Sequence, residues 1–112
     1  MKVAVSSTGK NLEDEVADVF GRCPYFMIIE IKNKKITKTQ ALKNINAEQM
    51  GGAGVLAAQT LVEKNVNSII SNNIGPRALE ALDQFKIKIY QGNGSVEKVI
   101  KELINSNLKK IN

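Results

Sequence analysis

The sequence predicts an α/β fold in which a mixed β-sheet is flanked by helices. Two features of the pattern lead to this class. The first half of the chain has β-forming runs around a short polar turn, which is typical of an antiparallel hairpin. The second half alternates helical segments with short apolar strands, which is typical of parallel strands joined by right-handed crossovers. With 112 residues, we expect one domain over 1–112.

The first half is expected to contain a buried strand, a loop, a short helix and a hairpin. The segments are KVAV (2–5) as the strand, SSTGK (6–10) as the loop, NLEDEVADVF (11–20) as the start of a short helix, and YFMIIEI (25–31), KNKK (32–35) and ITKTQAL (36–42) as the hairpin. Asn11 is a favourable residue to cap the short helix. Asn33 tolerates the left-handed backbone that a tight turn requires.

The second half is expected to contain three helices and two strands. The helices are AGVLAAQTLVEK (53–64), PRALEALDQF (76–85) and SVEKVIKELI (95–104), and the strands are VNSII (66–70) and KIKIY (86–90). Pro76 suits the first position of a helix, where its missing N–H costs nothing. Ser95 is the expected cap of the last helix, whose apolar residues recur at the spacing of one helix face.

Composition bounds the class of protein. One cysteine forms no internal disulfide, and no apolar run approaches the roughly 20 residues of a membrane span. The apolar run at the N-terminus stops at Ser6, which is too short for a secretory signal. We therefore expect a cytoplasmic protein with no membrane partner.

The net charge of +5 does not predict nucleic-acid binding. Five lysines gather over residues 32–43, but no aromatic side chain is interleaved with them for base stacking. A solvated hairpin is the simpler interpretation. The acidic residues of 13–18 lack the spacing of a calcium loop and are expected on a solvated surface.

Catalytic chemistry has few candidates. The chain has no histidine, so it has no ready general base near neutral pH, no catalytic triad and no zinc site of the usual Cys/His kind. We expect a protein that is not an enzyme.

A binding site is expected beyond the carboxyl ends of the parallel strands. The segments expected there are SSTGK (6–10), GGAG (51–54), NNIGPR (72–77) and QGNGS (91–95). Glycine-rich helix starts favour an anionic ligand. GAGVLA (52–57) also matches a dinucleotide fingerprint, but no strand is predicted before it, so the match is weak. For QGNG, turn formation is the better interpretation, whereas for GGAG and NNIGPR turn formation and ligand binding both remain open.

Three stretches in the same order resemble one family. They are FGRCPYF (20–26), QMGGAGVLAAQTLVEK (49–64) and NNIGPRALEALDQFKIKIYQGNGSVEKVIKEL (72–103). The chain is similar to the NifX/NifB-type dinitrogenase iron–molybdenum cofactor biosynthesis family, also called nitrogenase accessory factor-like. The resemblance implies a ribonuclease-H-like fold with a five-stranded sheet whose second strand is antiparallel to the rest. It also implies that the protein binds iron–sulfur or iron–molybdenum precursors and carries them between cofactor-assembly proteins.

The candidate residues for such a cofactor follow from the resemblance and from their chemistry. They are Arg22, Cys23, Gly51, Gly52, Gly54, Asn73, Gly75 and Arg77, with Cys23 as the one metal ligand. Arg22 is expected to lower the pKa of the Cys23 thiol, and one thiolate suits transient carriage. Packing of Cys23 as a small hydrophobe is the alternative. Members of the family often have His at the places of Val19 and, approximately, Met50.

Two functions are therefore predicted. The first is a non-catalytic carrier of an iron–sulfur or iron–molybdenum cofactor precursor. The alternative is a small-anion or nucleotide-binding regulatory module that uses the glycine-rich helix starts. We expect a monomer or a weak dimer, because the edge strand ITKTQAL (36–42) is rich in lysine and discourages pairing between copies.

Overall fold

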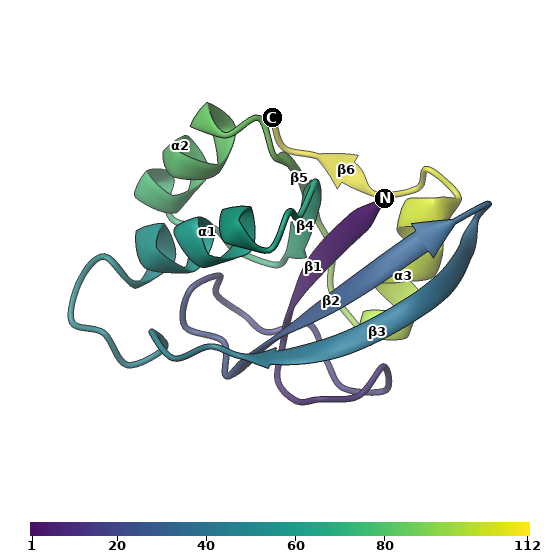
Figure 1. The fold of residues 1–112 in the computed structure, drawn as a ribbon, viewed down its shortest axis with the longest axis horizontal. Coiled ribbons are helices and arrows are strands. Elements are labelled where there is room, and N and C mark those ends of the chain that lie inside the picture. The colour runs from purple at the N-terminus through teal and green to yellow at the C-terminus, as the bar shows by residue number, and fades with distance from the viewer.

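The computed structural model describes residues 1–112 as a mixed α/β fold of three helices and a six-stranded sheet (Figure 1). The strands are β1 (Lys2–Ser7), β2 (Tyr25–Lys32), β3 (Lys35–Lys43), β4 (Ser68–Ser71), β5 (Lys88–Gln91) and β6 (Lys109–Lys110). The helices are α1 (Ala53–Glu63), α2 (Pro76–Gln84) and α3 (Val96–Ile104). None of the helices is long and apolar enough to cross a membrane.

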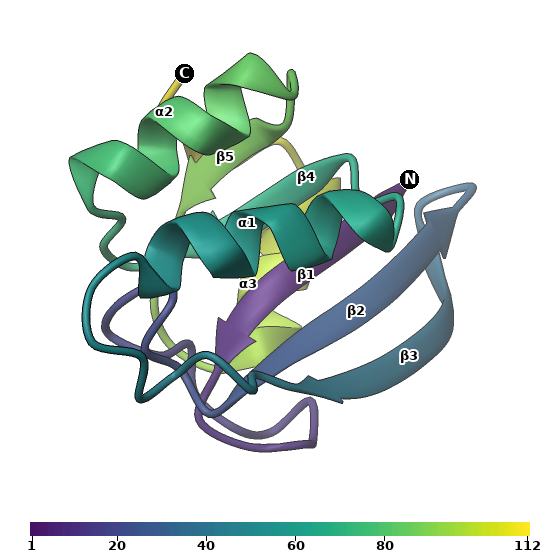
Figure 2. The same ribbon diagram turned by 60° about the vertical axis from the view of Figure 1, so that its left-hand side comes forward.

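The sheet has the strand order β3-β2-β1-β4-β5-β6. β1, β4 and β5 are parallel neighbours, and β2 is antiparallel to both β1 and β3, so the predicted hairpin and helical crossovers are confirmed. Asn33 takes the predicted left-handed conformation in the hairpin turn, with φ of 51°. Figure 2 shows α1 and α2 on one face of the sheet and α3 on the other.

The predicted count of five strands is wrong, because β6 adds a sixth strand antiparallel to β5. β6 is two exposed lysines with no apolar pattern, so the sequence gives no strand signal there. One backbone bond and one side-chain bond hold this segment: the Ile111 N–H donates to Ile89 O at 2.7 Å, and the Ile89 N–H donates to the side-chain oxygen Asn112 Oδ1 at 2.9 Å. The ribonuclease-H-like classification stays a prediction from the resemblance.

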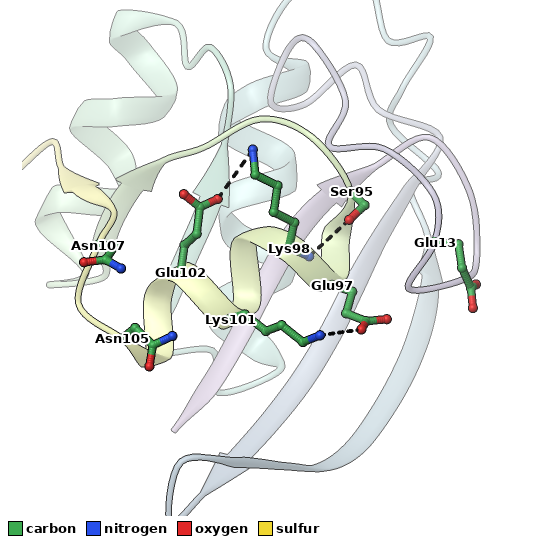
Figure 3. A pocket seen from close by; sticks show the side chains of 8 residues that line it. All are labelled: Glu13, Ser95, Glu97, Lys98, Lys101, Glu102, Asn105 and Asn107. Carbon is green, nitrogen blue, oxygen red and sulfur yellow. Dashed lines mark hydrogen bonds and ion pairs between the residues drawn. The ribbon is translucent and has the colours of Figure 1, made fainter.

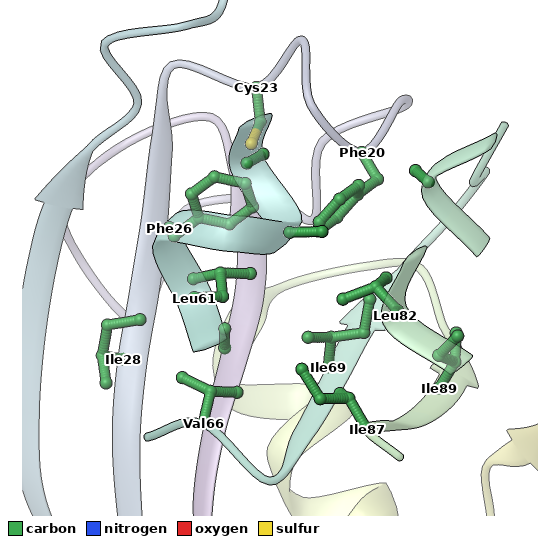
Figure 4. Packing of buried hydrophobic residues seen from close by; sticks show 14 of the residues in the cluster. Phe20, Cys23, Phe26, Ile28, Leu61, Val66, Ile69, Leu82, Ile87 and Ile89 are labelled. Atoms are coloured by element: carbon green, nitrogen blue, oxygen red, sulfur yellow. The ribbon is translucent and has the colours of Figure 1, made fainter. Parts of the chain in front are cut away.

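Two apolar cores lie on opposite faces of the sheet, because side chains alternate along each strand. On β1, Ala4 belongs to the core under α1 and α2, whereas Val3 and Val5 belong to the core under α3. Phe20 and Phe26 pack together in the first core with ring centroids 5.4 Å apart (Figure 4). Phe20, Phe26 and Met27 are buried.

The helix expected at 11–20 does not form. This segment instead crosses the end of the sheet and bonds to the end of β1 and to the loop before α3. The Ala17 N–H donates to Ser6 O, and the Val16 N–H donates to Gly94 O, both at 2.8 Å. Asn11 does not cap a helix; it forms a turn with Asp14, whose carboxylate accepts the Asn11 N–H at 2.9 Å. Backbone partners at the end of β1 and in the loop before α3 therefore replace the helical hydrogen bonds here.

A contact among small residues joins the start of α1 to its neighbours. Gly21 has φ of +92°, and a Cβ added to it would lie 2.7 Å from Gly54 Cα. A Cβ added to Gly54 would in turn lie 2.8 Å from Ala78 Cβ on α2. Only residues of this size allow the 20–23 loop, α1 and α2 to approach so closely. We call these three residues the Gly21–Gly54–Ala78 contact.

Replacing Gly21 with Ala is expected to destabilise the protein by about 3 kcal/mol, because the new Cβ clashes with backbone and φ is positive. Gly75→Ala is the matched control, since no atom lies within 4 Å of its added Cβ and its φ is −66°. Urea unfolding followed by circular dichroism measures both. Equal stability of the two variants would contradict the close contact.

Candidate functional site

A cleft of about 370 Å³ lies where the 19–22 loop meets the N-terminal ends of α1 and α2. Its lining consists of Val19, Phe20, Arg22, Gly52, Ala53, Gly54, Val55, Gly75, Pro76, Arg77 and Ala78. The Gly21–Gly54–Ala78 contact brings these three segments together. Five of the predicted site residues are therefore neighbours: Arg22, Gly52, Gly54, Gly75 and Arg77.

The two helices whose N-termini lie at the cleft, α1 and α2, have no side-chain cap there. The first intrahelical bond of α1 runs from the Leu56 N–H to Gly52 O, and that of α2 from the Leu79 N–H to Gly75 O. The N–H groups before those bonds have no acceptor inside their helix. In α3, by contrast, Ser95 Oγ accepts the Lys98 N–H at 3.1 Å. The cleft thus combines uncapped N–H groups with the positive ends of two helix dipoles.

Arg22 and Arg77 add positive charge that no acidic side chain neutralises. The ion pairs of the protein are Lys38–Glu30, Lys98–Glu102 and Lys101–Glu97. Arg22 Nη1 donates to the carbonyl oxygens of Gln49 at 2.6 Å and Ala47 at 3.2 Å, while Arg77 is exposed at the start of α2. The electrostatics of the cleft therefore favour an anion.

Cys23 lies beside this cleft but not in its lining. Its side chain is buried with 1% of its surface exposed, and the sulfur points into the apolar cluster near Phe26 (Figure 4). Asn44 Nδ2 donates to Cys23 O at 2.9 Å, which fixes the backbone at this position. The structure thus shows the packing that the sequence left open as the alternative role of this residue.

The expected effect of Arg22 on the Cys23 thiol is wrong. Burial raises the pKa of the Cys23 thiol above its ordinary value of 9.0, although hydrogen bonds from Gly21, Ser6, Ser7 and Asn44 oppose the rise. Arg22 makes its hydrogen bonds to the 47–49 loop and does not set this pKa. The thiol is therefore protonated at neutral pH in this conformation.

The other two predicted residues, Gly51 and Asn73, shape the backbone next to the cleft and do not line it. Gly51 has φ of +79° in the turn before α1. Asn73 Nδ2 donates to Asp18 O at 3.0 Å, and Asn73 O accepts the Phe20 N–H at 2.8 Å. These bonds hold the 18–20 segment next to the end of β4, so Asn73 positions the cleft wall without lining it.

Two of the four segments expected at one site do not reach the cleft. SSTGK (6–10) and QGNGS (91–95) hold the 11–20 segment instead, through bonds such as Val16 N–H to Gly94 O. A larger hollow of about 530 Å³ lies along α3 (Figure 3), but it has no apolar lining and its lysines and glutamates pair at exposed i,i+4 positions. We interpret it as a solvated helix face.

Sequence reasoning missed the apolar part of the cleft. Val19 is 43% exposed, although it is apolar, and Phe20 forms part of the wall as well as of the core. The protein has no group of three or more His, Cys, Asp or Glu side chains that would hold a metal ion.

Comparison with known proteins gives one consistent family. The family model described as dinitrogenase iron-molybdenum cofactor matches residues 1–106. An uncharacterized protein of Methanocaldococcus jannaschii is 34% identical over 111 residues, which cover 98% of this chain and 91% of the relative. A second one from the same organism is 30% identical over 112 residues, covering 99% and 94%.

Solved structures agree with this result. An NMR structure of a Thermotoga protein described as a candidate NifB protein has a TM-score of 0.83 and 31% identity, covering 97% of this chain and 91% of that one. The apo orange protein of Desulfovibrio gigas has a TM-score of 0.90 over 98% and 92% of the chains, and its 23% identity supports the fold alone. None of these proteins is described as a nucleotide-binding or regulatory module, so that alternative has no support here.

The raised pKa of Cys23 predicts a pH dependence of stability. A thiol whose pKa is higher in the folded protein contributes stability below the unfolded pKa of about 9, and this contribution is lost as pH rises further. The difference in unfolding free energy between wild type and Cys23→Ala should therefore narrow above about pH 9. Urea unfolding across this range measures it. A constant difference would mean that the thiolate is not disfavoured.

Proposed function

We propose that this chain, which belongs to the dinitrogenase iron–molybdenum cofactor family, is a non-catalytic carrier. Its cargo is an iron–sulfur or iron–molybdenum cofactor or a precursor of one, held in the cleft between the 19–22 loop, α1 and α2. The observation that carries this proposal is the meeting of two uncapped helix starts with two arginines that have no acidic partner.

The charge of the cleft suits this cargo. Metal–sulfide clusters with anionic sulfur ligands carry net negative charge, and their surface sulfurs accept hydrogen bonds. Arg77 and the unbonded nitrogens of Arg22 supply charge, and the N–H groups at Gly54 and Val55 supply donors. Phe20 and Val19 form an apolar wall that lowers the local dielectric and strengthens these contacts.

The shortage of metal ligands suits transient carriage. The chain has one cysteine and no histidine, so its side chains do not form a permanent cluster site of the usual cysteine kind. Binding through charge and hydrogen bonds leaves the metal sites free for the ligands of a receiving protein. Such a carrier needs no catalytic group, and it delivers its cargo to cofactor-assembly proteins.

A second version of the same proposal has the Cys23 sulfur as a ligand of the cargo. As a ligand, its sulfur would need the Gly21–Pro24 loop to open, since it is buried in this structure. The loop is held by Asn44, whose Nδ2 also donates to Gly21 O at 3.0 Å. We place Cys23 in the packing around the cleft, and we design the experiment so that a thiolate ligand would be recognised.

The test is anaerobic titration with a preassembled iron–sulfur cluster capped by small thiolates, and separately with tetrathiomolybdate, followed by visible absorption after gel filtration. Arg22→Gln and Arg77→Gln should each weaken retention of the probe about tenfold, because each removes a charge-assisted contact. Retention should also fall with rising salt concentration.

Two controls separate the versions. Lys101→Gln removes a positive charge on α3, whose ion pair with Glu97 lies away from the cleft, and it should leave retention unchanged. Cys23→Ser should also leave it unchanged. Loss in Cys23→Ser with normal retention in both arginine variants would assign the cargo to the thiolate. If Lys101→Gln lost as much retention of the probe as the arginine variants, the binding would depend on net charge alone, and the cleft would be refuted as the binding site.

A further inference from the structure

The two edges of the sheet differ. At one edge, β6 covers β5. At the other edge, β3 pairs with β2 alone, and no further strand pairs with its outer side (Figure 1). β3 is nine residues long, contains neither glycine nor proline, and has no buried residue. An open edge of this length presents a row of unpaired backbone groups to a partner.

The register identifies which amide groups face outward. Met1 and Ile31 exchange backbone hydrogen bonds of 2.9 and 2.8 Å, so the amide of Ile31 faces β1. Because the direction of the amide N–H alternates along a strand, the amides of Ile28 and Glu30 face β3. Asn44 N–H donates to Pro24 O at 2.9 Å, which extends the same alternation to the end of the hairpin.

The residues of β3 alternate correspondingly. Lys38, Gln40 and Leu42 lie opposite Glu30, Ile28 and Phe26, so their amides bond to β2. The amides of Thr39, Ala41 and Lys43 therefore face solvent. The register shift at Glu30/Ile31 confines this regular edge to Lys38–Lys43, which spans about 20 Å.

The charge along this edge has one sign. Five lysines lie on the hairpin: Lys32, Lys34, Lys35, Lys38 and Lys43. Glu30 is the one acidic residue of the two strands, and it lies 4.0 Å from Lys38 in an exposed ion pair. A second copy placed against β3 would bring these lysines together, which is unfavourable. An acidic strand would form cross-strand pairs of opposite charge.

We propose that the open edge of β3 binds an acidic extended segment of a partner protein, which adds to the sheet as a further strand. Backbone hydrogen bonds to Thr39, Ala41 and Lys43 supply affinity, and the lysines select acidic side chains. This docking surface is separate from the cleft, since no residue of β3 lines the cleft. The inference therefore stands or falls independently of the proposed cargo.

The test uses a fluorescein-labelled peptide that alternates Val and Glu, with binding measured by fluorescence anisotropy. A second peptide of the same charge has proline at alternate positions, so it retains electrostatic attraction but lacks the N–H groups for pairing. We expect the first peptide to bind at least about tenfold more tightly than the second. Binding should also slow hydrogen exchange at the amides of Thr39, Ala41 and Lys43.

Variants of one position complete the test. Ala41→Pro removes an outward N–H and leaves the bonds to β2 in place, so it should fold and lose most of the binding. Ala41→Ser keeps the N–H and should bind like the wild type. Equal binding of the two acidic peptides would overturn the proposal in favour of charge alone. Dimerisation of the wild type that Ala41→Pro abolishes would assign the edge to a second copy and would also overturn it.

Discussion

The candidate site depends on the close approach of three backbone segments at the Gly21–Gly54–Ala78 contact. Without side chains at Gly21 and Gly54, the loop that follows Phe20 lies directly on the first turn of α1, and α1 lies directly on α2. This approach places two helix starts and the 19–22 loop around one cleft. Larger residues at either glycine would separate the segments whose combined charge defines the site.

The chemistry of the cleft comes mainly from backbone and arginine groups. Dipoles and N–H groups recognise negative charge without providing a strong metal ligand, which agrees with release as well as binding. The buried Cys23 takes no part in the cleft, because it fills the core beneath the 20–23 loop. The loop thus contributes Arg22 to the cleft and Cys23 to the core from adjacent positions.

Periodicity predicted most of the fold. The hairpin, the three helices and the parallel strands follow from local patterns, and each boundary falls within two residues of its expected place. The predictions for two segments were wrong, and each error has a physical reason. The 11–20 segment is fixed by bonds to Ser6 and Gly94, which are distant in sequence, and β6 is held by Asn112 and main-chain bonds, with no apolar pattern.

The site was predicted where parallel strands end and helices begin. For Cys23 the sequence left packing and ligation both open, because a single cysteine between Arg and Pro has no periodicity to place it, and the structure shows the packing.

The central claim is that the backbone at the starts of α1 and α2 binds an anionic metal–sulfur cargo. An amide chemical-shift titration by NMR with tetrathiomolybdate tests it most directly. The account predicts that shifts gather at Gly52–Val55, at Arg77–Ala78 and at Arg22, with α3 unchanged. Shifts concentrated on α3 or spread evenly over the lysine-rich surface would contradict it.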